Sequence, residues 1–195
     1  MREALIAAAR QLLGDRGPEG FSLTDAAKLA GVSPAAPYRH FRDREALLAE
    51  VAAEGFGLFG QRLAAALSSA PGQSGFTAMG RAYLAFAREE PGFYAAMFSQ
   101  RAQPPGEDAD GAGRPAYEIL LRGVAGALAQ HGGAGVDAEA FARQVWALSH
   151  GVASLERAGC FGRTRPGEAE DLLVSGVEAL LRGARERAAA ETAPA

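Results

Sequence analysis

Five side chains that can donate hydrogen bonds crowd into seven consecutive positions of this chain: Tyr38, Arg39, His40, Arg42 and Arg44. Guanidinium, imidazole and phenol groups are typical partners of nucleic-acid phosphate oxygens. Asp43 is a candidate cap for a helix that follows, and the free amides at such a helix start attract anions near Arg44. The stretch therefore predicts contacts to a phosphate backbone.

The residues before this cluster predict two short helices joined by a tight turn. Ser22 is a candidate N-cap, and Asp25 lies three positions later, where a carboxylate favours the positive end of a helix. Gly31 suits a left-handed turn residue, and Ser33-Pro34 starts a second helix that is expected to run to about Phe41. This is the helix-turn-helix arrangement, in which the second helix is laid in the DNA major groove.

Small residues open the second helix of this pair. Ala35 and Ala36 allow a close approach to base edges, and their methyl groups can meet a thymine methyl. Pro37 interrupts the same first turn, because it has no amide to bond back to the Ser33 carbonyl. We expect this proline to distort the start of the recognition helix.

These residues resemble the DNA-binding signature of the TetR family of transcriptional repressors. The resemblance is carried by Thr24, Ala27, Ala30-Gly31-Val32-Ser33, Tyr38, His40-Phe41, Arg44 and Leu47. It implies an all-α homodimer with a three-helix head, a connecting helix and a ligand-binding body. By position it implies DNA-backbone contacts from Tyr38, His40 and Arg44, and places Ser33, Ala35 and Ala36 at the bases; Thr24 and Arg39 complete the expected DNA-binding set. The expected domains are 1–48 for the head, 49–187 for ligand binding and dimerisation, and 188–195 for a disordered tail.

A connecting helix is predicted from about Arg44 to Ser68, and three glycines interrupt its apolar face. Gly55, Gly57 and Gly60 each cost about 1 kcal/mol relative to alanine in a helix interior. Two explanations stay open at this stage: close packing of another helix against a bare backbone, or a built-in bend.

Aromatic and methionine side chains are dense in the second half of the chain. Such stripes are compatible with a simple core or with a cavity for an apolar or aromatic small molecule. The candidate ligand-binding residues are Met79, Tyr83, Phe86, Phe93, Tyr94, Met97, Phe98, Tyr117, Leu121, Trp146 and His150. The run from Trp146 to Gly151 also resembles a Trp…His-Gly pattern in the body of one TetR subgroup.

Other chemistry finds little support in the residue pattern. His150 has no second His or Cys at ligand spacing, so we expect no metal, and a hydrogen-bonded buried histidine is the favoured interpretation. An enzyme using His150, Cys160, Glu118 or Glu156 is disfavoured, because no nucleophile and base stand at a recognisable spacing. No cofactor is expected. Cys160, the single cysteine, is interpreted as a loop thiol.

The charge of the chain is unevenly divided. The formal net charge is −3, yet residues 1–48 carry seven Lys and Arg against six Asp and Glu. Because screening limits exposed charges to about 10 Å, the local basic cluster matters more than the total. With no long apolar run and no pair of cysteines, we expect a cytoplasmic protein that does not insert in a membrane.

The combined interpretation is a ligand-responsive DNA-binding transcriptional regulator, of the repressor type, released from an inverted-repeat operator by an apolar or aromatic effector. Two amphipathic helices at the end of the chain predict a homodimer through a four-helix interface. The alternative is a dimeric small-molecule binding module without sequence-specific DNA recognition. An activator role also stays open.

Overall fold

The computed structural model describes residues 1–69, 73–99, 111–131, 133–161 and 167–192. Every regular element in these ranges is helical, which confirms the all-α prediction. The elements are α1 (Arg2–Arg16), α2 (Leu23–Leu29), the 3-10 helix η1 (Pro37–Arg39), α3 (Arg44–Ser68), α4 (Gln73–Glu89), α5 (Pro91–Met97), α6 (Arg114–Gln130), α7 (Ala138–Arg157) and α8 (Glu168–Thr192). No helix in the described part of the chain combines the length and the apolar character that crossing a bilayer requires.

The helix ends follow local capping chemistry. At α2 the Ser22 hydroxyl accepts from the Asp25 amide at 3.1 Å, and Asp25 Oδ2 accepts from the Ser22 amide at 2.9 Å. This capping box satisfies two free donors reciprocally. At α7 the Asp137 carboxylate accepts from the amides of Glu139 and Ala140, at 2.9 and 3.1 Å. The observed range of α3 matches the one expected for the connecting helix.

The chain divides into two compact units. Unit 1 contains residues 1–59 and 89–116, and unit 2 contains residues 60–88 and 117–195. The division differs from the expected boundary after position 48, because α5 joins the unit that contains α1 and α2. Helix α3 contributes residues to both units.

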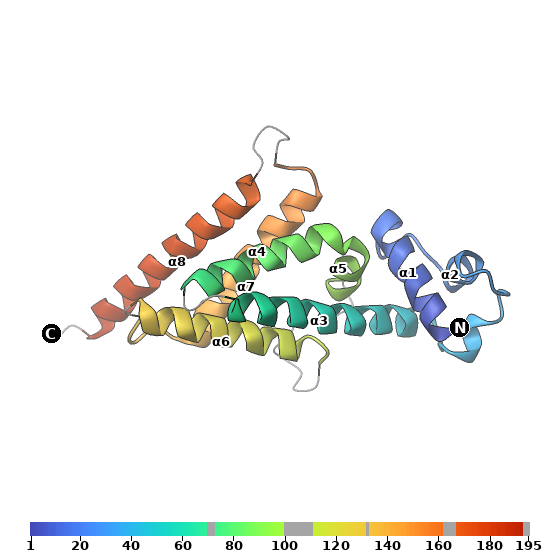
Figure 1. Ribbon diagram of the computed structural model, residues 1–195, viewed down its shortest axis with the longest axis horizontal. Coiled ribbons are helices and arrows are strands. Elements are labelled where there is room, and N and C mark those ends of the chain that lie inside the picture. Colours follow the sequence, from blue (N-terminus) through green and yellow to red (C-terminus); the bar gives the residue numbers. More distant parts are fainter. Residues whose placement is uncertain (70–72, 100–110, 132, 162–166, 193–195) are drawn as a thin grey trace. The chain divides into compact units, whose positions relative to one another are not determined.

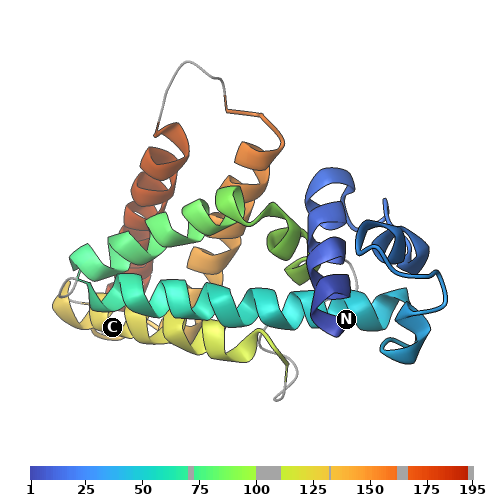
Figure 2. The same cartoon turned by 45° about the vertical axis from the view of Figure 1, so that its right-hand side comes forward.

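Helix α5 lies against α1 within unit 1, side by side in Figures 1 and 2. The approach is so close that a Cβ on Gly92 would come within 2.0 Å of the Arg10 carbonyl oxygen. The Arg10 guanidinium forms an ion pair with Glu90 and lies 4.5 Å from the centre of the Phe93 ring. A residue with a side chain at position 92 would not fit, so glycine sets the distance between these helices.

Two of the α3 glycines, Gly55 and Gly57, have different surroundings. A Cβ on Gly55 would lie 2.9 Å from Met97 Sδ and 3.1 Å from Phe93 Cβ, both on α5. A Cβ on Gly57 would have no heavy atom within 4 Å. Gly55 therefore serves close helix packing, one of the two explanations left open by the sequence.

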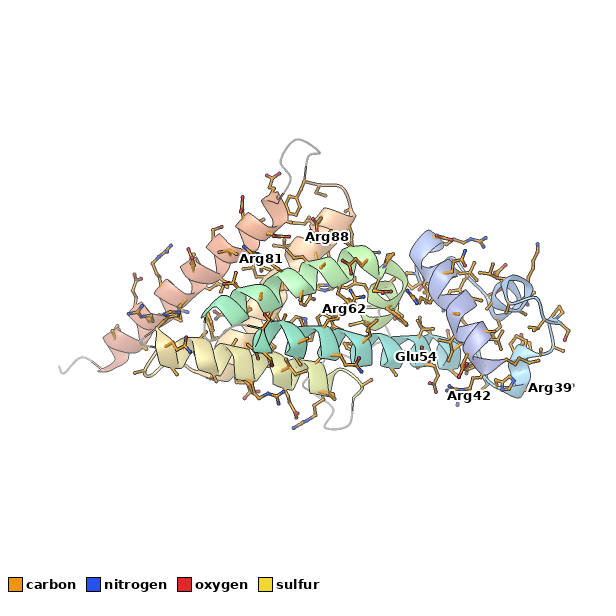
Figure 3. The ribbon with its side chains drawn as sticks, viewed as in Figure 1. Arg39, Arg42, Glu54, Arg62, Arg81 and Arg88 are labelled. Carbon is orange, nitrogen blue, oxygen red and sulfur yellow. The ribbon has the colours of Figure 1, made fainter. Side chains whose placement is uncertain are left out.

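Unit 2 has its own apolar core. Six buried residues of α6, α7 and α8 form it: Val124, Leu128, Phe141, Ala142, Val145 and Ala184. At the surface of this unit Arg88 of α4 bonds to Glu156 of α7 at 3.1 Å and to Glu170 of α8 at 3.3 Å. Arg81, also on α4, forms a further ion pair with Glu170 at 3.6 Å, and Figure 3 labels both arginines. The ion pairs of Arg81 and Arg88 join α4 to α7 and α8.

Helix α8 extends beyond its expected end. We expected disorder from position 188, but the helix continues to Thr192 and Ala188 is only 8% exposed. The sequence from 183 to 192 is rich in Ala, Glu and Arg, which are strong helix formers. Residues 193–195 lie outside the described part of the chain.

Candidate nucleic-acid interface

The turn after α2 has the geometry that the sequence predicted. Gly31 has φ of +70°, in the left-handed region, and its amide donates to the Lys28 carbonyl at 3.2 Å. The Val32 amide donates to the Ala27 carbonyl at 3.0 Å. These bonds cap the carboxyl end of α2 and redirect the chain toward Ser33.

The segment after the turn is not the α-helix that we expected from Pro34 to Phe41. It consists of turns and the short helix η1, with the Ala36 amide donating to the Ser33 carbonyl at 2.9 Å and the Arg39 amide to the Ala36 carbonyl at 3.2 Å. Pro37 has no amide for the α-helical bond to Ser33, and its ring is buried in the head. Three-residue bonds predominate up to His40, and an α-type bond is made by the Phe41 amide, which donates to the Pro37 carbonyl at 2.9 Å. The distortion expected from Pro37 therefore extends over most of the recognition segment.

Most of the expected DNA-binding residues face solvent within unit 1. Tyr38 is 61% exposed although it is a large aromatic residue. Those classed as exposed are Thr24, Ser33, Ala35, Tyr38, Arg39 and His40, while Ala36 is half-buried. Figure 3 labels Arg39 and Arg42 within the head. The structure therefore brings aromatic, basic and small residues together on one accessible segment.

Arg42 continues this exposed segment. Its side chain is 86% exposed and its Nε donates to Asp43 Oδ2 at 2.8 Å. This hydrogen bond raises the pKa of Arg42 above its usual value. A guanidinium is charged at any physiological pH even without such a bond. Asp43 also caps α3 by accepting from the Ala46 amide at 2.7 Å. An exposed arginine next to a helix start is suited to a phosphate.

Arg44 lies differently from the other basic residues. Its side chain is 23% exposed, its Nε donates to the Phe21 carbonyl at 3.1 Å, and its Cζ lies 4.9 Å from the centre of the Phe21 ring. Phe21 is buried in the head, with 5% of its surface exposed. The two residues are 23 positions apart, and no sequence spacing indicates a pair at that separation.

The candidate ligand-binding residues are divided between the two units. Phe93, Tyr94, Met97 and Phe98 belong to unit 1, and the other seven belong to unit 2. In unit 2, Met79, Tyr83 and Phe86 are buried, while those half-buried are Tyr117, Leu121, Trp146 and His150. The Tyr117 and Trp146 rings are 5.8 Å apart, and a Cβ on Gly123 would lie 2.9 Å from Met79 Cε.

Two polar groups stand among these apolar residues. The Tyr117 hydroxyl oxygen is buried and makes no well-aligned hydrogen bond within the described part of the chain, although Arg143 lies near it; burial raises the pKa of Tyr117, and Arg143 opposes this shift. His150 Nε2 lies 3.5 Å from the Ser154 hydroxyl, and burial lowers the pKa of His150. Among the described residues no three His, Cys, Asp or Glu side chains gather as a metal would require.

Sequence and structure comparisons relate the chain to known proteins. The family model described as bacterial regulatory proteins, tetR family, matches residues 5–51, and that described as tetracyclin repressor-like, C-terminal domain, matches residues 76–180. YobS of Bacillus subtilis (strain 168), an uncharacterized HTH-type transcriptional regulator, is 30% identical over 95 residues, 49% of this chain and 50% of that protein. The match thus spans about half the length of that curated relative.

Two solved structures resemble nearly the whole chain. A protein of unknown function from Rhodococcus sp. RHA1 is 30% identical with a TM-score of 0.72, covering 94% of this chain and 95% of that one. PfmR, a TetR family transcriptional regulator from Thermus thermophilus, is 20% identical with a TM-score of 0.67, covering 91% and 97%. At the latter identity the likeness establishes the fold.

Proposed function

Because this chain belongs to the TetR family of DNA-binding transcriptional regulators, we propose that it is a repressor whose grip on an inverted-repeat operator is released by a small effector. The observation that carries the proposal is the exposed segment after the Gly31 turn. Tyr38, Arg39 and Arg42 present a ring and two guanidinium groups to solvent there. Such a concentration of donors next to a helix-turn-helix turn suits a phosphate backbone.

The bases are read by the small residues of the same segment. Ser33 and Ala35 are exposed beside the basic cluster, and η1 replaces a long recognition helix. A short segment that carries Tyr38 and His40 toward the backbone brings Ala35 toward the groove floor. Thr24, at the exposed start of α2, adds a hydroxyl to the same face.

The repressor acts as a homodimer with two-fold symmetry. Large apolar side chains on α7 and α8 support a second copy as the partner, because Leu155 is 47% exposed and Leu172 is 41% exposed. Pairing these two helices with their symmetry copies covers such residues in a four-helix interface. Two recognition segments then enter successive major grooves, about 34–36 Å apart along the DNA.

The effector is an apolar or aromatic small molecule held by the body in the cytoplasm, where bacterial DNA lies. Met79, Tyr83 and Phe86 supply soft and flat surfaces in unit 2, and the buried Tyr117 hydroxyl supplies a donor for one polar group of the ligand. The effector acts by binding better to a conformation that does not fit the operator, and this difference in affinity sets the degree of release. No catalytic step is needed.

Selection of duplexes from a random pool at near-physiological salt tests the proposal. An enriched inverted repeat is the expected result. Ala35→Glu, which places a carboxylate on the exposed segment, abolishes the enrichment, while Ala129→Glu, at an exposed position of α6 in unit 2, leaves it unchanged. Binding that depends on salt but enriches no sequence would favour the alternative of a dimeric small-molecule binding module without operator recognition.

A further inference from the structure

We propose that Arg44 is a positioning residue, which fixes the frame of the helix-turn-helix from inside the head and makes no phosphate contact of its own. This inference rests on the proposed DNA-binding function and departs from the role that sequence position suggests for Arg44. Its basis is the set of contacts that Arg44 makes within unit 1.

The guanidinium of Arg44 is engaged by the head itself. Its Nε donates to the Phe21 carbonyl at 3.1 Å, and its Nη1 lies 3.4 Å from Glu45 Oε1. The Phe21 ring, which is 5% exposed, lies 4.9 Å from Arg44 Cζ. The remaining nitrogen, Nη2, is buried and has no hydrogen-bond partner in the described part of the chain. A side chain held by a carbonyl, a carboxylate and a ring would have to leave all three to reach a phosphate.

The position of these contacts along the chain explains what they fix. Phe21 immediately precedes the α2 cap Ser22, and Arg44 is the first residue of α3. The segment 22–43 between them contains α2, the Gly31 turn and η1, so Arg44 ties together the two ends of the whole DNA-reading segment. Holding both ends reduces the number of conformations open to the segment before it meets DNA.

A second pair of contacts reinforces the same frame. Arg2 of α1 lies 5.5 Å from the centre of the Phe41 ring and forms a 2.6 Å ion pair with Glu50 of α3. Phe41 follows η1 and is 3% exposed. Through Arg2, the far end of the recognition segment is therefore anchored on α1, which is itself paired with α3. By contrast, Arg42 extends from this frame with 86% of its side chain exposed. Charge for the phosphate and charge for the frame are thus assigned to different arginines.

The test uses one substitution on each side of the contact between Arg44 and Phe21, which is called the clasp below. Arg44→Ala removes the cation, and Phe21→Leu removes the ring while it keeps both the backbone carbonyl and the charge at position 44. Affinity is measured as a function of salt, on the duplex enriched from the random pool and on a random-sequence duplex. Arg122→Ala, at an exposed position of α6, controls for the loss of one positive charge.

Arg44→Ala is expected to lose about tenfold in affinity for the enriched duplex, as for one hydrogen bond to a charged group. Phe21→Leu keeps that hydrogen bond and loses the ring beneath the guanidinium, so its loss is expected to be smaller, about threefold to tenfold, as for a cation–π contact. Neither variant changes the slope of log affinity against log salt, and the affinity for random duplex falls less than that for the enriched one. A slope lowered by about one in Arg44→Ala, with Phe21→Leu unaffected, would show a phosphate contact and overturn the proposal. Unchanged operator affinity of the folded variants together with a lower Tm would overturn it as well, because the clasp would then be structural only.

Hydrogen exchange on the free protein makes the test independent of DNA. Amides of α2 and η1 are expected to exchange faster in Phe21→Leu than in the wild type, while amides of α7 are unchanged. Equal exchange of α2 and η1 would refute the clasp even where Arg44→Ala fails to fold. A wild-type protein that enriches no duplex would refute the proposed function, whereas the exchange result still reports on the clasp.

Discussion

Two glycines of α3, two positions apart, provide a matched test of helix packing in unit 1. Replacing either with alanine improves the intrinsic helix propensity by about 1 kcal/mol. The surroundings differ, because a methyl group on Gly57 meets no heavy atom within 4 Å, while one on Gly55 comes within 2.9 Å of Met97 Sδ and 3.1 Å of Phe93 Cβ. The pair therefore separates helix propensity from packing.

The expected magnitudes follow from these distances. Gly57→Ala keeps its full gain and stabilises the protein by about 1 kcal/mol. For Gly55→Ala the methionine thioether can move, but Phe93 Cβ is fixed to the backbone of α5, and overpacking of a fitted contact costs about 1–3 kcal/mol. The net effect of Gly55→Ala is then between neutral and about 2 kcal/mol destabilising, so the two variants differ by about 1–3 kcal/mol.

Thermal and urea unfolding of both variants at one protein concentration measure this difference. For a chain of this size 1 kcal/mol moves Tm by about 2–4 °C, and the shared concentration removes the effect of dimer dissociation. Equal stabilisation by both alanines would show that α5 does not pack on Gly55 as described. A loss of stability in Gly57→Ala would indicate instead that α3 needs a glycine at position 57 in order to bend. At position 55 close packing already accounts for the glycine.

Further predictions concern single side chains. Arg42→Ala lowers the slope of log DNA affinity against log salt by about one, since an exposed guanidinium suits a phosphate; an unchanged slope would place Arg42 away from the DNA. Ser22→Ala removes the capping box of α2 and costs about 1 kcal/mol in urea unfolding. Tyr117→Phe changes the free energy of unfolding by no more than about 1 kcal/mol in either direction, because the buried hydroxyl has Arg143 as a polar neighbour without a well-aligned hydrogen bond to it; a larger loss of stability would reveal a stronger bond. Burial lowers the pKa of His150 below 6.5, so on acidification the histidine is protonated in the unfolded chain before it is protonated in the folded one. The free energy of unfolding therefore falls as pH drops from 6.5 through the pKa of the folded state. His150→Gln is expected to flatten that part of the plot of stability against pH. Because His150 is only half-buried, its share stays well under the limiting slope of about 1.4 kcal/mol per pH unit.

The positions of several helices could be predicted because residues close in sequence determine where a helix begins and ends. Ser22 and Asp43 are candidate caps in the sequence, and the structure begins α2 and α3 directly after them. Apolar spacing then gives the length of each helix. The ionic contact of Arg88 with Glu156 and Glu170 escapes such reasoning, because it joins residues from three separate helices.

Three features of the head depend on contacts that no local pattern reveals. The sequence predicts that Pro37 distorts the start of the recognition helix, but only the structure shows that its ring is buried and that the distortion reaches as far as η1. Gly92 lies in the first turn of α5, and only the structure shows the Arg10 carbonyl against it. Arg44 has the residue type of a phosphate ligand, while Phe21, its partner, is distant in sequence. Whether the expected DNA-binding and ligand-binding residues perform those roles stays a prediction.

The composition of unit 1 has a consequence for biosynthesis. Its first segment, residues 1–59, leaves the ribosome before α5, which fills the surface beside Arg10 and Gly55 and belongs to the second segment, residues 89–116. At a synthesis rate of about 5–20 residues per second, residues 1–59 spend several seconds outside the ribosome without α5. During that interval the apolar faces of α1 and α3 that α5 covers are open to chaperones, and they are closed only when the middle of the chain has been made.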